Sequence, residues 1–131
     1  PNNMLIKIMK KILTFILFII LSNASAAEYK SNFAIDKFKQ AQNKGKTVVV
    51  HSWNKFCYTC RTQKPILEQA QIDFRDVIFM NYEQTKNKDI ANFLKISYWT
   101  TIAIYKNNKQ VAKAVGLHEK DDIYNLIKKG I

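Results

Sequence analysis

Both cysteines of the chain lie in one CxxC motif, Cys57 to Cys60, placed between two segments with different hydrophobic patterns. The preceding stretch KTVVVHSW, residues 46–53, is a β-branched run after Gly45, which is typical of a buried strand. After the motif, apolar residues recur three and four positions apart, as one face of a helix requires: Ile66, Leu67, Ala70 and Phe74. The sequence therefore predicts two thiols at a junction where a strand passes into a helix.

A structural role explains this cysteine pair poorly. A disulfide across two intervening residues closes a very small loop, and the entropic stabilisation by a disulfide grows with loop length. A structural zinc site needs four ligands. Beyond the two cysteines the chain offers only His51 and His118 as nitrogen ligands, and their spacing matches no zinc motif. We therefore favour a reactive thiol pair over a structural disulfide or a structural zinc site.

The position at a helix start also favours reactivity. A thiolate at Cys57 would meet the unpaired N–H groups and the positive dipole end of the following helix. Lys55 and Arg61 add positive charge nearby. Both effects stabilise the thiolate, which is the nucleophile in disulfide exchange. Cys60, about one helical turn later, can then attack a mixed disulfide formed at Cys57.

Residues 48–65, VVVHSWNKFCYTCRTQKP, resemble the active-site segment of thioredoxin-fold oxidoreductases. The similar features are the hydrophobic strand, Trp53 four residues before the first cysteine, aromatic Phe56 beside it, and Pro65 where that family's long helix is kinked. A CxxC motif alone is a weak signal, but it is a strong one in this setting. The resemblance extends over residues 31–131. It implies an enzyme that acts on protein disulfides, with Cys57 attacking and Cys60 resolving.

The remaining segments follow the order of that fold. Two further strands around an Asn107–Asn108 turn form a plausible hairpin, and the first helix has Ser31 or Asn32 as its candidate cap. The predicted order is α-β-α-β-α-β-β-α, an α/β thioredoxin fold with a central mixed sheet of about four strands flanked by helices. Besides the segments around the motif, the predicted elements fall within residues 31–46, 76–83, 87–96, 100–116 and 119–131.

Thr100 is the larger departure from the family pattern. The family usually has a cis-proline at the head of the hairpin strand, facing the cysteines, and Thr100 stands in that place. A cis bond before a residue other than proline costs about 2.5–4 kcal/mol. Thr100 is therefore a strained cis residue, a trans residue beside a reshaped substrate groove, or simply the first residue of the strand.

His51 is the second departure, because it occupies the position of the buried acid that assists proton transfer to the second cysteine in many thioredoxins. A neutral imidazole can accept a proton, so His51 is either a proton relay for Cys60 or an inert core residue. The dipeptide between the cysteines, Tyr58-Thr59, tunes the redox potential in this family but matches no pairing that implies a direction.

Aromatic residues near the motif form a predicted docking surface for an extended substrate segment. We expect Trp53 to belong to the core and His118 to lie on the surface near the final helix. The candidate substrate-binding residues are Trp99, Thr100, Phe56, Tyr58 and Thr59, with Tyr98 alongside.

The N-terminal segment has the three parts of a secretory signal peptide. From Met9 it reads MKKILTFILFIILSNASA: two lysines, an apolar stretch over residues 12–21, and Ala24 and Ala26 in A-x-A spacing. The apolar stretch is shorter than the roughly 20 residues that span a bilayer. We predict cleavage after Ala26, a domain over residues 27–131 and a periplasmic location, with uncleaved membrane anchoring as the alternative.

Composition narrows the partners. Residues 27–131 carry 18 basic and 10 acidic side chains, a net charge of +8. The lysines are scattered, without the stripe or arginine cluster of a nucleic-acid binder, so we interpret the charge as a solvated surface and expect no nucleic acid. The expected partners are protein thiols and disulfides, with a membrane electron donor where the protein is a reductase. Dedicated oxidases of this superfamily carry an inserted helical domain, and we find no segment for one in this sequence. We therefore favour a reductase or electron carrier over an oxidase.

We expect a monomer, no cofactor and no resident metal. The alternative hypothesis is a metallochaperone or assembly factor on the same fold, in which the two thiolates hold a soft ion such as Cu(I). No methionine-rich patch or further cysteine supports it.

Overall fold

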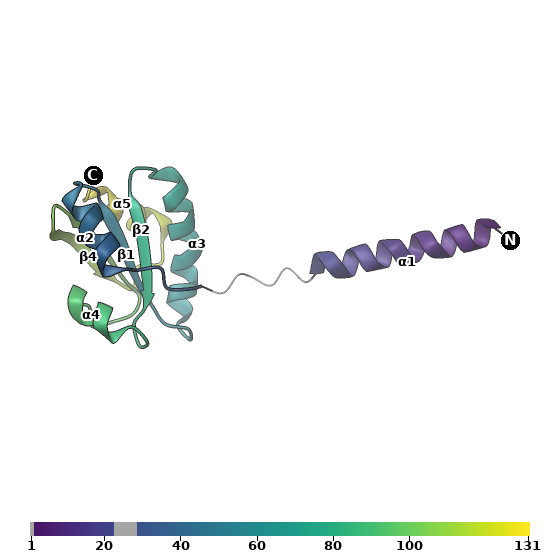
Figure 1. Cartoon of the computed structure of the whole chain (residues 1–131), viewed down its shortest axis with the longest axis horizontal. Helices are drawn as coiled ribbons and strands as arrows, with labels where there is room; N and C mark the ends of the chain where they lie inside the picture. Colours follow the sequence, from purple (N-terminus) through teal and green to yellow (C-terminus); the bar gives the residue numbers. More distant parts are fainter. Residues whose placement is uncertain (1, 23–28) are drawn as a thin grey trace.

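The computed structural model describes residues 2–22 and 29–131, the latter forming a four-stranded mixed sheet with helices on both faces (Figure 1). The strands are β1 (Val48–Trp53), β2 (Ile78–Glu83), β3 (Thr101–Lys106) and β4 (Lys109–Val115), in the spatial order β2-β1-β3-β4. Strand β1 pairs with β2 in parallel and with β3 in antiparallel orientation, and β3 pairs with β4 in antiparallel orientation. The predicted element order and the thioredoxin fold are confirmed.

Two hydrophobic clusters hold the helices against the sheet. Because successive side chains of a strand point to opposite faces, Val48 and Val50 of β1 join one cluster and Val49 joins the other. The first cluster packs helices α2 (Ile35–Asn43) and α4 (Lys88–Leu94) on one face. The second packs α3 (Tyr58–Asp73) and α5 (Lys120–Lys128) on the other. Strand β1 is thus covered on both sides, which explains its unbroken apolar run.

The local signals at the C-terminal half of the sheet behave as predicted. Asn107 and Asn108 both have positive φ, 52° and 62°, as a two-residue turn matched to the twist of a hairpin requires. The final helix buries Ile123, Leu126 and Ile127 against the sheet.

The predicted cap of the first helix is wrong. Helix α2 begins at Ile35, its N-cap is Ala34, and no side chain caps it. Instead, Ser31 Oγ accepts a hydrogen bond from the Glu83 backbone N–H (2.9 Å), and Asn32 Oδ1 accepts one from the Asn81 N–H (2.7 Å). Strand β2 lies at the sheet edge and has unpaired backbone groups, so these polar side chains bind the strand rather than the helix.

The N-terminal helix α1 (Asn2–Ser22) contains the apolar stretch of the predicted signal peptide. None of the helices in the described part of the chain combines the length and apolar character needed to cross a bilayer. The predicted cleavage site at Ala24 and Ala26 lies outside the described residues, so the signal peptide stays a prediction.

Candidate active site

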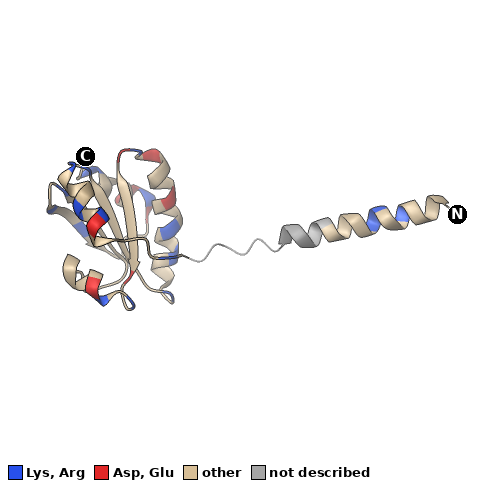
Figure 2. Cartoon of the chain, in the orientation of Figure 1, with Lys and Arg blue, Asp and Glu red and all other residues tan. Residues whose placement is uncertain are grey.

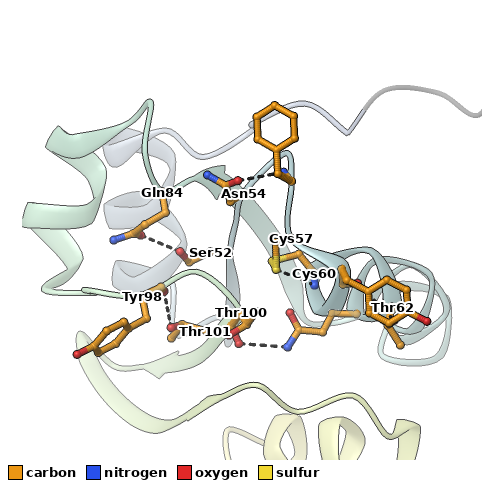
Figure 3. Close-up of a disulfide and its surroundings, with 12 residues drawn as sticks. Ser52, Asn54, Cys57, Cys60, Thr62, Gln84, Tyr98, Thr100 and Thr101 are labelled. Atoms are coloured by element: carbon orange, nitrogen blue, oxygen red, sulfur yellow. Dashed lines mark hydrogen bonds between the residues drawn. A yellow bond between two sulfur atoms is a disulfide. The ribbon is translucent and has the colours of Figure 1, made fainter.

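The two cysteines lie at the start of α3, directly after the loop that leaves β1 (Figure 3). They form a disulfide, and their Cα atoms are 5.3 Å apart. Cys57 is the N-cap of α3, and its Sγ accepts a hydrogen bond from the Cys60 backbone N–H at 3.1 Å. The exposed fraction is 9% for Cys57 and 3% for Cys60. The sulfur of Cys57 therefore occupies the site where a helix end stabilises negative charge.

Trp53 forms the floor beside the disulfide. Its ring is buried as predicted, packs with both cysteines and lies against the Tyr29 ring, with the two ring centroids 4.9 Å apart. Its indole N–H donates to Asn81 Oδ1 at 2.8 Å. Trp53 thus links the cysteine loop to β2 and, through Tyr29, to the segment that precedes α2.

His51 belongs to a buried hydrogen-bonded chain that starts at Tyr29 and ends at the loop before β3. Tyr29 Oη lies 3.0 Å from His51 Nδ1, and His51 Nε2 lies 2.9 Å from Gln63 Oε1. The Gln63 amide nitrogen donates to two backbone carbonyls, those of Thr100 (3.1 Å) and Leu117 (2.7 Å). His51 and Gln63 are 1% and 0% exposed. The chain thereby joins α3 to both ends of the β3–β4 hairpin.

These contacts define the protonation state of the imidazole. Because Gln63 gives both amide hydrogens to carbonyl groups, its Oε1 faces His51 and can only accept. The proton of His51 therefore resides on Nε2, and Nδ1 accepts from the Tyr29 hydroxyl. Burial lowers the pKa of His51 to about 4, against the opposing effect of the Gln63 hydrogen bond, and burial raises the pKa of Tyr29. His51 is neutral at physiological pH.

Both ring nitrogens of His51 are occupied by partners other than the cysteines in this disulfide state. The proposed proton transfer between His51 and Cys60 stays a prediction that concerns the reduced protein. The sequence reasoning missed Gln63 and Tyr29. The role of Gln63 could have been predicted from its position, because it lies with Leu67 and Ala70 on the apolar face of α3. A polar residue on that face needs a buried hydrogen-bond partner.

Thr100 adopts a trans conformation in the loop before β3. The described residues contain no cis peptide bond, and Thr100 has φ of 58°, the left-handed region that a β-branched residue rarely adopts. Its carbonyl accepts hydrogen bonds from the Gly116 N–H (3.0 Å) and from Gln63. Strand β3 begins one residue later, at Thr101. The cis and strand-start alternatives are therefore wrong, and Thr100 is trans, whereas the reshaped substrate groove stays a prediction.

Four aromatic side chains near the disulfide are exposed: Phe56 at 85%, Tyr58 at 80%, Tyr98 at 68% and Trp99 at 47%. Phe56 is presented by a loop in which its own N–H donates to Asn54 Oδ1 at 3.0 Å. Thr59 is partly buried in the first turn of α3. Figure 3 shows Tyr98 and Thr100 on the loop that lies across from the cysteines. The residues predicted to bind substrate are thus accessible on both sides of the motif, and their role in binding stays a prediction.

The described residues hold no group of three His, Cys, Asp or Glu side chains that could bind a metal ion. His118 is exposed, as predicted, and its Nε2 lies 3.5 Å from Glu119 Oε1. The Cu(I) hypothesis therefore rests on the two cysteines alone.

This geometry can be compared with known proteins. The thioredoxin family model matches residues 29–129. The chain belongs to the thioredoxin family. Among curated thioredoxins, that of Rickettsia bellii is 31% identical over 87 residues, which cover 64% of this chain and 81% of the relative. The thioredoxin of Coprinus comatus is 26% identical over 84 residues, covering 63% of this chain and 79% of the relative.

Solved thioredoxin structures agree with the fold of this thioredoxin-family chain. The Trxlp protein of Edwardsiella tarda superposes with a TM-score of 0.70 at 20% identity, covering 76% of this chain and 98% of that one. The reduced thioredoxin pre-protein of Schistosoma mansoni gives a TM-score of 0.64 at 28% identity, covering 79% and 95%. With the disulfide between Cys57 and Cys60, family membership makes this protein a thiol–disulfide oxidoreductase whose substrates are protein thiols and disulfides.

Proposed function

We propose that this protein is an exported reductase or electron carrier that reduces disulfides of client proteins in the periplasm. The observation that carries the exchange chemistry is the position of Cys57 as the N-cap of α3, with its Sγ accepting the Cys60 N–H. The direction rests on the elements described over residues 29–131, which include no inserted helical domain. A thiolate formed there keeps that hydrogen bond and the favourable end of the helix dipole. Cys57 is also the more exposed of the two cysteines.

The reaction proceeds in two exchange steps. The Cys57 thiolate attacks one sulfur of the client disulfide, forms a mixed disulfide and releases the first client thiolate, which takes up a proton. Cys60 then loses its proton, and its thiolate attacks Cys57 Sγ, so that the protein disulfide forms and the second client thiolate leaves. Two electrons pass from the protein dithiol to the client. A donor of two electrons and two protons, which we place in the membrane, restores the dithiol.

Two features of the molecule favour opposite directions of electron flow. The helix end, Lys55 and Arg61 stabilise the reduced thiolate, which favours an oxidant. Against this, the elements described over residues 29–131 are those of the fold itself, without an inserted helical domain. We give the absence of an inserted domain in these residues more weight, since the dedicated oxidases of this superfamily carry one.

The equilibrium reduction potential of the Cys57–Cys60 pair tests the direction. The full chain is equilibrated in glutathione buffers, and the alkylated thiols are counted by gel shift. We expect a potential near that of thioredoxin, about −270 mV. A potential near −120 mV, at the oxidising end of the same scale, would make the protein a disulfide donor and overturn the proposed direction.

An exported reductase needs an electron donor in the membrane. The proposal of export rests on the lysines, the apolar stretch and the A-x-A spacing of residues 9–26. Expression of the full chain in a bacterium followed by N-terminal sequencing of the periplasmic fraction tests it. A mature protein that starts at Ala27 is expected. A full-length chain recovered in the membrane fraction would favour anchoring instead.

We expect a monomer, and sedimentation equilibrium of the same material measures the mass.

A further inference from the structure

A cavity beside the disulfide is lined by basic side chains from separate parts of the chain. Its volume is about 470 Å³, and Cys60, Trp53 and Tyr29 contribute to its wall. The basic residues come from the segment before α2, the β1–α3 loop, the first turns of α3 and the segment after β2. They are Lys30, Lys55, Arg61, Lys64 and Lys86, and the one carboxylate in the lining is Glu83.

Most of this positive charge is not neutralised by the protein itself. Glu83 is paired with Lys86 at 3.3 Å, and Lys64 is paired with Glu68 at 2.6 Å. Lys30, Lys55 and Arg61 form no ion pair within residues 29–131 of the structure. Figure 2 shows Lys and Arg positions on several elements of the domain. Five of these basic residues line the cavity beside Cys60. A cleft lined by one sign of charge concentrates the field and attracts the opposite charge.

From this arrangement we propose that the cavity binds acidic residues of the client protein next to its reacting cysteine. This inference rests on the proposed function and names its preferred substrate class. The volume is far larger than the roughly 30 Å³ share of one water molecule, so the cavity has room for side chains of a client segment. The buried ring of Trp53 and the partly buried ring of Tyr29 provide an apolar wall below the charges.

The cavity wall contains Cys60, the disulfide partner of the nucleophile Cys57, and this proximity favours a client segment as the occupant. Lys55 lies two residues before Cys57, and Arg61 lies one helical turn after it, where its N–H donates to the Cys57 carbonyl (3.3 Å). A client joined to Cys57 by a mixed disulfide therefore has its neighbouring residues at the rim. Each extended residue spans about 3.3–3.6 Å, so positions two or three from the client cysteine reach the cavity.

Two variants of the full chain separate this site from the overall charge. The test variant is Lys30→Glu with Lys55→Glu. The control is Lys109→Glu with Lys113→Glu, two exposed lysines on β4 with the same change in net charge. Each protein is reduced beforehand and mixed with disulfide-linked peptides in which aspartate, asparagine or lysine flanks the cysteine. Each peptide carries a fluorophore and a quencher on the two sides of its disulfide, so the rise in fluorescence on reduction measures the single-turnover rate.

We expect the wild type to reduce the aspartate peptide about tenfold faster than the asparagine peptide at low salt, and the lysine peptide more slowly still. The test variant loses this preference, and the control variant keeps it. Any effect of Lys55 on the Cys57 thiolate cancels in the ratio, because all three peptides meet the same thiol. The preference also weakens in 0.5 M salt, where charges are screened within about 3–5 Å. An unchanged ratio in the test variant, or an equal loss in the control, would overturn the inference.

A binding measurement keeps this test independent of turnover. The indole N–H resonance of Trp53 is followed while a cysteine-free aspartate peptide is added to the oxidised protein. A shift in the wild type and control, absent in the test variant, supports the site even where no peptide is reduced. No shift in the wild type, or an equal shift with a single-stranded oligonucleotide, would contradict it. Absence of peptide reduction with intact binding would count against the reductase proposal alone.

Discussion

Replacement of Gln63 by leucine tests whether the buried chain from Tyr29 to Thr100 stabilises the domain. Gln63 is fully buried and makes three hydrogen bonds, to His51 Nε2 and to the carbonyls of Thr100 and Leu117. Leucine has a similar volume and makes none of them. In the described residues every buried side-chain nitrogen and oxygen has a partner. The substitution would leave the His51 Nε2–H without one.

The expected loss follows from these three contacts. A buried donor without an acceptor costs about 1–3 kcal/mol. The Thr100 carbonyl keeps the Gly116 N–H, and Leu117 is partly exposed, so each lost carbonyl contact costs only about 0.5–1.5 kcal/mol. Part of this is returned by the burial of an apolar side chain. We expect Gln63→Leu to lower the free energy of unfolding by about 3 kcal/mol.

Urea denaturation of the oxidised protein at pH 7, followed by circular dichroism, measures this loss. The m-value should stay the same, so that the midpoint shift reports stability. Gln71→Leu is the matched control, because Gln71 is an exposed residue of the same helix, and surface substitutions of this kind stay within about 0.5 kcal/mol. A loss below about 1 kcal/mol for Gln63→Leu, or one equal to the control, would refute the structural role assigned to Gln63.

Three further predictions follow from the same site. The pKa of His51 is about 4 in the folded protein and 6.5 in the unfolded chain. Between these pH values the unfolded chain binds a proton that the folded protein does not. The free energy of unfolding is therefore highest above pH 6.5 and falls by about 3 kcal/mol as the pH drops toward 4. Urea titrations at several pH values measure this, and His51→Gln should flatten the slope; an unchanged slope would contradict a buried neutral imidazole. Cys57→Ser should abolish reduction of insulin disulfides, whereas Cys60→Ser should accumulate mixed disulfides visible on non-reducing gels; wild-type activity in both variants would exclude the exchange mechanism. Thr100→Pro should lower the free energy of unfolding by about 2 kcal/mol or more, because proline holds φ near −65° and Thr100 has φ of 58°; a variant as stable as the wild type in urea would show that the loop does not require this conformation.

Several features of the molecule follow from short stretches of sequence alone. The β-branched run before the cysteines, the apolar spacing after them and the Asn107–Asn108 turn each depend on periodicity or local backbone preference, which neighbouring residues decide. The thiol pair at a helix start was predictable for the same reason. The order of these elements was then sufficient to indicate the thioredoxin fold.

Long-range contacts decided the rest. Ser31 and Asn32 have the chemistry of helix caps, but the free edge of β2 lies within their reach and takes their hydrogen bonds instead. Thr100 adopts a left-handed conformation, and its carbonyl accepts hydrogen bonds from Gly116 and Gln63, two residues that are distant in sequence.

The clearest difference between sequence and structure concerns charge. Along the chain the lysines are scattered, a pattern that predicts a solvated surface. The fold brings basic residues from four segments, spanning Lys30 to Lys86, around one cavity beside Cys60. Sequence determines local conformation because neighbouring residues set it, whereas a charged cavity or a buried polar chain needs side chains that only the packed sheet and helices bring together.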